Sequence, residues 1–142
     1  MTAFRFQSIL DQRLSMRDQA AMEIGKVNEA IAKIESDIAG VDDELSACND
    51  TTDGRTGAVS VDRLLTRGRY ALQLTADRRT LVETLGKLHV ELEARRSRLA
   101  AAQTEVRKFE LLRDRHAADR QATVVRRQQS VADEFAGRMH RR

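Results

Sequence analysis

The chain has 142 residues, 33% of them charged, a formal net charge of +3 and a mean hydropathy of −0.53. It contains no Pro or Trp, one Tyr and four Phe, which argues against a close-packed globule with proline-containing loops. This length leaves room for one small domain, and the abundant helix formers favour long helices with narrow apolar seams. Disorder is the competing interpretation, but regular apolar spacing argues against it for most of the chain.

The first predicted helix covers residues 4–47. From Ala20 onward apolar residues recur with alternating spacings of four and three, which is typical of a heptad seam, and the pattern continues less regularly back to Phe6. Gly25 and Gly40 weaken the helix by about 1 kcal/mol each relative to Ala. The seam consists of Ala20, Ile24, Val27, Ile31, Ile34, Ile38, Val41 and Leu45.

A polar loop is predicted at residues 48–60, within the stretch "SACNDTTDGRTGAVS". Asn49-Asp50 and Asp53-Gly54 are turn residues, and Ser60 is placed to cap the next helix. A break of this kind between two heptad seams predicts an antiparallel helical hairpin. A flexible hinge in a parallel homodimer is the alternative.

The second predicted helix covers residues 61–139. Its seam is apolar at eight of nine positions, and Leu64, Leu65, Leu72 and Leu74 precede it on a broader face. The nine positions are Leu81, Leu85, Leu88, Leu92, Arg95, Leu99, Ala102, Val106 and Phe109. The predicted fold class is therefore all-α, a long two-helix antiparallel coiled-coil hairpin, with residues 1–142 forming a single coiled-coil domain.

The two predicted helices differ in length. If the chain folds back symmetrically near Asp53, residue i faces residue 106 minus i, and the first helix ends opposite Ala102. Residues 103–142 then form a C-terminal overhang without a partner in the chain, about 60 Å long if wholly helical. An isolated helix is marginal in water, so we expect another molecule to order this segment. Val131, Phe135 and Met139 lie on one of its faces.

Charge is distributed unevenly along the chain. Residues 1–50 hold five Lys/Arg against ten Asp/Glu, whereas residues 96–142 hold twelve against six. A basic C-terminal region is compatible with nucleic acid, but the interspersed acidic residues and the scarcity of aromatics argue against nucleic acid as a partner. A protein partner with an acidic surface accounts better for the arginines together with Phe109 and Phe135.

No catalytic or cofactor chemistry is evident in the sequence. His89, His116 and His140 are scattered without metal-ligand spacing, and "DGRTGAVS" lacks the ending of a phosphate-binding loop. The acidic run at 42–44 is best interpreted as a solvated helix end. We expect no enzyme activity, no cofactor, no metal and no small-molecule substrate. The lone Cys48, the absence of an apolar leader and the lack of a membrane-spanning run predict a soluble cytoplasmic protein.

Several segments resemble the FliJ family, a coiled-coil component of the flagellar type III export apparatus. They are "FRFQSILDQR" (4–13), "VDRLLTRGRYALQL" (61–74), "VRKFELLRDRHAADRQ" (106–121) and "RRQQSVADEFAGR" (126–138). The resemblance covers essentially the whole chain, and the basic-Gln-then-"DEFA" ending is its more specific part.

The resemblance implies a structure like the central stalk of rotary ATPases, with a role in flagellum biogenesis and motility. Its partners would be the hexameric flagellar export ATPase, the cytoplasmic part of the export gate and export chaperones, at the inner membrane. The matching positions make Tyr70 and Leu74 gate-binding residues, although the charged stretch "TADRRT" (75–80) departs from an extended gate patch. The ATPase-binding residues would be Arg113, Arg127, Gln128, Asp133, Glu134 and Phe135.

Three alternatives remain compatible with the sequence. The first is the equivalent stalk protein of a virulence secretion system, because the same fold and charge fit both. The second is a self-assembling structural coiled coil, and the third is a nucleic-acid clamp.

Overall fold

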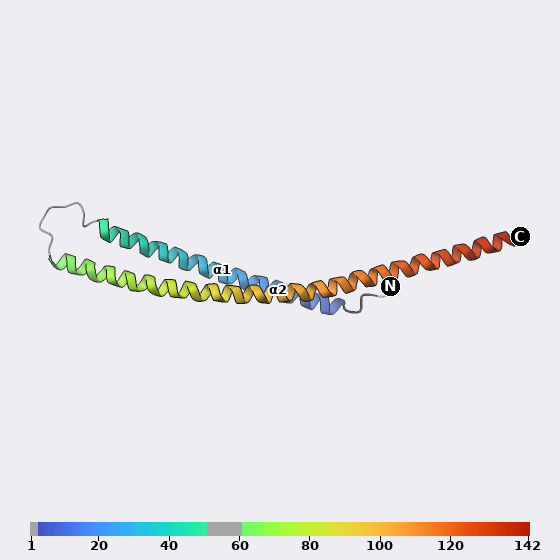
Figure 1. Ribbon diagram of the computed structural model, residues 1–142, viewed down its shortest axis with the longest axis horizontal. Helices are drawn as coiled ribbons and strands as arrows, with labels where there is room; N and C mark the ends of the chain where they lie inside the picture. The colour runs from blue at the N-terminus through green and yellow to red at the C-terminus, as the bar shows by residue number, and fades with distance from the viewer. Residues whose placement is uncertain (1–2, 51–60) are drawn as a thin grey trace. The chain divides into compact units, whose positions relative to one another are not determined.

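The computed structural model describes residues 3–50 and 61–142. Two helices account for the regular structure of this part of the chain, α1 (Gln7–Asp50) and α2 (Val61–His140), and it contains no strand (Figure 1). The prediction of an all-α helical hairpin is confirmed. The prediction that the first helix covers residues 4–47 and that Asn49-Asp50 form a turn was wrong, because α1 begins at Gln7 and its helical hydrogen bonding continues through Asp50. The rest of the predicted loop, with Asp53-Gly54 and the capping Ser60, lies outside the described residues. That the chain is a single domain stays a prediction.

The helices pack in two units, Ala21–Arg98 and the combination of Met1–Ala20 with Leu99–Arg142. The core of Ala21–Arg98 consists of Val27 and Ile31 from α1 with Leu92 from α2, each less than a tenth exposed. Partly buried Ile24, Leu85 and Leu88 surround them. These residues belong to the two predicted seams, so the heptad spacing correctly identified the buried faces.

Polar contacts within Ala21–Arg98 show the direction of the helices. Arg95 Nη1 lies 2.6 Å from Glu23 Oε2, and Arg78 Nε lies 2.6 Å from Asp42 Oδ1. Residue numbers therefore fall along α2 as they rise along α1, which is the antiparallel arrangement.

In the unit formed by Met1–Ala20 and Leu99–Arg142, the start of α1 packs on α2. Leu10 is fully buried and Val106 is 3% exposed. The rings of Phe6 and Phe109 have centroids 6.4 Å apart, and those of Phe4 and His116 are 5.9 Å apart. From residue 117 to the end of the chain every residue is exposed.

The predicted register was wrong. A symmetric fold-back placed Glu23 opposite residue 83, but it contacts Arg95, about three helical turns further along α2. Likewise Phe4 lies against His116 and not near residue 102. The register of the two helices is set by packing of their apolar seams, so it cannot be calculated from the position of the loop centre. Among the described residues, the segment of α2 that packs on no part of residues 3–50 therefore begins after His116, about 14 residues later than predicted.

The ends of α2 carry charges that suit the helix dipole. Asp62 lies in the first turn, where negative charge is favourable, and Arg138 and His140 lie in the last turn. These charges favour a helix that continues through the exposed C-terminal segment.

Candidate partner-binding surfaces

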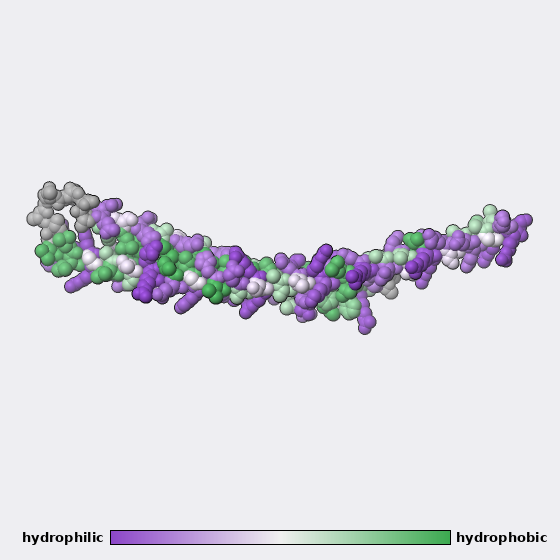
Figure 2. Space-filling model, viewed as in Figure 1, coloured by the Kyte–Doolittle hydropathy of each residue, from purple (hydrophilic) through white to green (hydrophobic). Residues whose placement is uncertain are grey.

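An exposed apolar stripe runs along the first turns of α2. Val61, Leu65, Gly68 and Leu72 follow one another at spacings of four, three and four, so they share one helix face. The three large side chains are 55–72% exposed, and the position of a Gly68 Cβ would meet nothing within 4 Å. Figure 2 shows apolar surface gathered over these turns. We call these four residues the α2 entry stripe.

Sequence reasoning missed the α2 entry stripe as a separate surface. It grouped Leu65 and Leu72 with Leu74 on one broad face continuous with the seam. Counting back from Leu81 by three and four reaches Leu74 and Leu64, whereas Leu65 and Leu72 are out of phase with that series. The phase difference is the signal that separates an exposed stripe from a buried seam.

Tyr70, predicted to contact the export gate, precedes Leu72 by two residues and so lies on the side of α2 away from the entry stripe, with its side chain half exposed. Its hydroxyl donates a hydrogen bond to the carboxylate of Glu44 on α1. This bond, followed by partial desolvation and the negative charge of Glu44, raises the pKa of the Tyr70 hydroxyl above its usual value of 10.0. The ring remains accessible while the hydroxyl links the two helices.

Leu74, the second residue predicted to contact the gate, is only 6% exposed and lies between the helices. The structure therefore places Tyr70 on an accessible surface and Leu74 in the packed interface. Residues 75–80 are all exposed, and Arg78 among them is held by Asp42. Part of the charged stretch that departed from the family pattern thus contacts α1.

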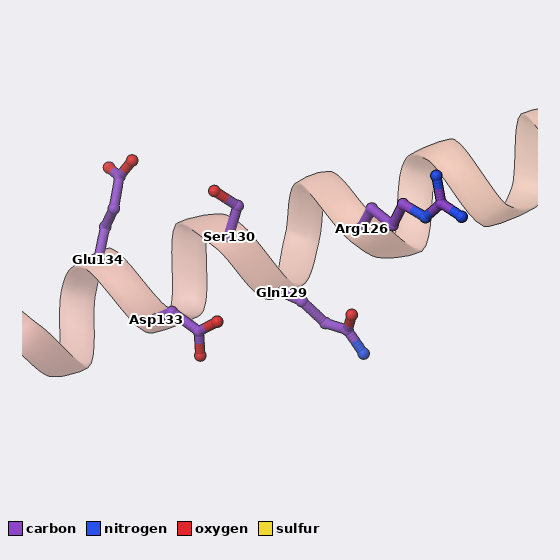
Figure 3. A pocket seen from close by; sticks show the side chains of 5 residues that line it. All are labelled: Arg126, Gln129, Ser130, Asp133 and Glu134. Carbon is purple, nitrogen blue, oxygen red and sulfur yellow. The ribbon is translucent and has the colours of Figure 1, made fainter.

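The six residues predicted to bind the ATPase are divided among different faces of α2. Arg113 lies 3.6 Å from its neighbour Asp114 (Nε to Oδ1), before the exposed segment begins. Arg127, Gln128 and Phe135 line a shallow depression with Val131 and Ala132. Asp133 and Glu134 line a second depression with Arg126, Gln129 and Ser130, which consists entirely of polar side chains (Figure 3). Five of the six residues therefore lie on two adjacent faces, one apolar and one polar, and their binding to the ATPase stays a prediction.

The apolar face of the exposed segment is long. Val124, Val131, Phe135 and Met139 are between 46% and 66% exposed. Phe135 has the largest side chain among them, and Arg127 lies at the edge of the same face. A large aromatic side chain beside an arginine is typical of the centre of a protein interface.

In residues 3–50 and 61–142, no group of three or more His, Cys, Asp or Glu side chains is arranged to hold a metal ion. Of the acidic residues near the end of α1, Asp42 and Glu44 hold Arg78 and Tyr70 of α2. Over the same ranges, neither helix is apolar over a length that could cross a bilayer.

A comparison with protein-family models decides the affiliation of the chain. The model of the flagellar FliJ protein matches residues 2–142, essentially the full length. The chain belongs to the FliJ family. Searches of curated proteins and of solved structures gave no significant match. Membership makes this an export-related coiled-coil protein of the flagellum and favours the flagellar over the virulence alternative.

Proposed function

We propose that this FliJ-family chain is a non-enzymatic coupling component of the flagellar export apparatus. It binds the hexameric export ATPase through the exposed end of α2. The single observation that carries the proposal is the apolar face that ends in Phe135 and Met139, which is exposed on a helix that extends past the reach of α1. A helix of this kind gains stability by packing on a partner.

The positive charge of the C-terminal region suggests that its site on the ATPase is acidic. Residues 96–142 hold twelve Lys/Arg against six Asp/Glu, and Arg127 lies at the edge of the apolar face. Arginines at the rim of an interface increase the rate of association, whereas buried aromatic anchors slow dissociation. In this proposal Phe135 is the anchor.

The proposed coupling depends on asymmetry. The chain offers six ATPase subunits two helices of different charge, because residues 1–50 are acidic while the C-terminal part of α2 is basic. A partner that bound all six subunits equally would shift no conformational equilibrium, whereas unequal contacts favour one subunit conformation at a time.

The proposal assigns the export gate to the first turns of α2, where the entry stripe and the ring of Tyr70 are exposed on opposite sides of the helix. The exposed leucines of the stripe and the half-exposed ring of Tyr70 are each suited to a partner that buries them. The buried Leu74 lies one turn after Tyr70 on the same side of α2 and would support its ring. Export chaperones are the third class of partner, and contact with the gate would keep the protein at the inner membrane.

Calorimetric titration of the ATPase with Phe135→Ala tests the main assignment. We expect at least a tenfold loss of affinity with an unchanged melting temperature, because Phe135 is 65% exposed and contributes little to the hairpin. Val90→Ala is a matched control, since Val90 is also exposed on α2 but lies outside both candidate surfaces. Binding of the Phe135 variant at wild-type strength would refute the role of this residue.

A further inference from the structure

The exposed end of α2 carries a heptad seam that no residue of α1 covers. Val124, Gln128, Val131 and Phe135 follow one another at spacings of four, three and four, and every one of them is exposed. Along one edge of this seam runs a second apolar row at a spacing of seven, formed by Val125, Ala132 and Met139. We call these seven residues the terminal seam. Such a pattern is typical of a helix that pairs with another helix.

The opposite edge of the terminal seam carries two opposite charges. Arg127 and Glu134 each immediately precede a seam position, and they are one heptad apart. No ion pair among residues 3–50 and 61–142 includes either side chain. In an antiparallel pair of helices, an edge faces the same edge of its partner, whereas in a parallel pair it faces the opposite edge. The charges of Arg127 and Glu134 therefore distinguish a parallel from an antiparallel pair of helices.

These charges complement one another when two copies of the segment pair in antiparallel orientation. Arg127 of each copy then faces Glu134 of the other, and the two-fold axis generates the ion pair twice. A parallel pair would instead place Arg127 beside Ala132, which offers no counter-charge.

The seam residues favour the same orientation. Antiparallel pairing in this register stacks Phe135 on Val124 of the second copy and Gln128 on its Val131. Parallel pairing stacks each residue on itself and so brings Arg138 against Arg138 inside the seam. Like charges held together in this way are destabilising.

We infer that a second copy of this chain occupies the terminal seam, paired in antiparallel orientation through residues 121–138. At the ends of this range Arg120 of one copy meets Arg141 of the other, which limits the pairing to the central turns. Because two separate molecules must meet, the dimer forms in a concentration-dependent manner.

This pairing has a regulatory consequence that rests on the proposed function. The dimer covers Phe135 and Arg127, the residues proposed to contact the ATPase, so self-pairing and ATPase binding exclude one another. The chain is then stored as a dimer with its apolar face protected, and the ATPase competes for the monomer.

Sedimentation equilibrium of the full chain without any ATPase tests the pairing, so its result does not depend on whether the ATPase proposal holds. We expect a monomer–dimer equilibrium that Arg127→Glu weakens at least tenfold. The charge-swapped double variant Arg127→Glu with Glu134→Arg should recover wild-type dimerisation within about threefold, because the ion pairs are restored with reversed sign.

The matched control is Arg126→Glu, which makes the same charge change one residue away on the polar face (Figure 3). It should leave the dimer constant within threefold. A chain that stays monomeric at all concentrations, or a double variant as weak as the single one, would overturn the inference. If Arg126→Glu and Arg127→Glu weakened dimerisation equally, the inference would also be overturned. The effect would then come from the net charge of the chain and not from a specific ion pair.

Disulfide cross-linking tests the orientation. In a Cys48→Ser background, Gln121→Cys and Arg138→Cys chains should form a mixed disulfide with one another under mild oxidation, since these positions face each other in the antiparallel dimer. Each variant alone should form little. Efficient self-cross-linking of the separate variants would show a parallel pair and contradict the proposal.

Discussion

Arg95 on α2 forms an ion pair with Glu23 on α1, with Nη1 and Oε2 2.6 Å apart. Arg95 is the one charged residue among the nine seam positions of α2, and its side chain is 26% exposed. Glu91, one turn earlier on α2, accepts from its other terminal nitrogen at 3.0 Å. The carboxylates of Glu23 and Glu91 therefore neutralise the one charged side chain in the α2 seam. The contact with Glu23 also fixes the position of α1 along α2. A single polar residue in an apolar seam is a known way to specify register.

Replacing Arg95 with Leu should raise the melting temperature of the hairpin. The substitution makes the seam apolar at all nine positions and removes the cost of desolvating a partly buried charge. Arg96→Leu is the control, because Arg96 is exposed and pairs with Glu93 on its own helix. Circular dichroism at 222 nm follows both melts. A fall of several degrees for Arg95→Leu would show that the ion pair stabilises the hairpin more than an apolar contact does.

Because Leu92 lies in the core of Ala21–Arg98, Leu92→Ala should strongly reduce the stability of the hairpin. Leu92 is 6% exposed and packs with Val27 and Ile31, so its truncation should lower the free energy of unfolding by about 2 kcal/mol. Leu72→Ala should change it by less than about 0.5 kcal/mol, because Leu72 is 72% exposed. Urea titration measures both values. Similar losses for the two variants would contradict the assigned buried face.

Tyr70 is the only tyrosine in the chain, so tyrosinate absorbance near 295 nm reports on it alone. Its pKa should lie above 10.0 and should fall toward that value in Glu44→Gln, which removes the charged acceptor. Because the folded-state pKa is the higher one, this hydrogen bond stabilises the hairpin below about pH 10. The contribution disappears as the pH rises through the folded-state pKa. An identical titration in both proteins would place Tyr70 away from Glu44.

Binding of the export ATPase should weaken as salt increases. The arginines of the C-terminal segment attract acidic side chains over distances that salt screens, with a Debye length of about 10 Å at 0.1 M. We expect the dissociation constant to rise several-fold between roughly 50 and 300 mM NaCl, with a smaller rise for Arg127→Gln. Fluorescence anisotropy over this series measures it. If the affinity for the ATPase did not change with salt, the arginines would not contribute to binding as proposed.

The sequence predicted the buried faces well because heptad spacing is a local property. All eight predicted seam positions of α1, from Ala20 to Leu45, and all nine of α2 are buried or partly buried. Register is different, since it depends on contacts between residues far apart in the chain. Turn residues near Asp53 therefore gave a fold-back point that placed Glu23 about three turns from its actual partner.

The candidate surfaces could be predicted only in part. The exposed position of Phe135 follows from the difference in helix lengths, which the sequence contains. The packing of Phe4 against His116 does not, because it depends on the register. Leu74 and Leu72 are two residues apart and similar in chemistry, yet one is buried and the other exposed. Only the phase of the helix relative to its partner distinguishes them.

The most direct test of the central claim is ATP turnover by the flagellar export ATPase of the same organism. It should be measured alone, with the full chain, and with a chain ending at Arg120, which retains all the packing of α1 on α2. We predict that the full chain stimulates turnover, that the shortened chain does not, and that both remain equally helical. Equal stimulation by the two chains would contradict the claim that the exposed end of α2 binds the ATPase.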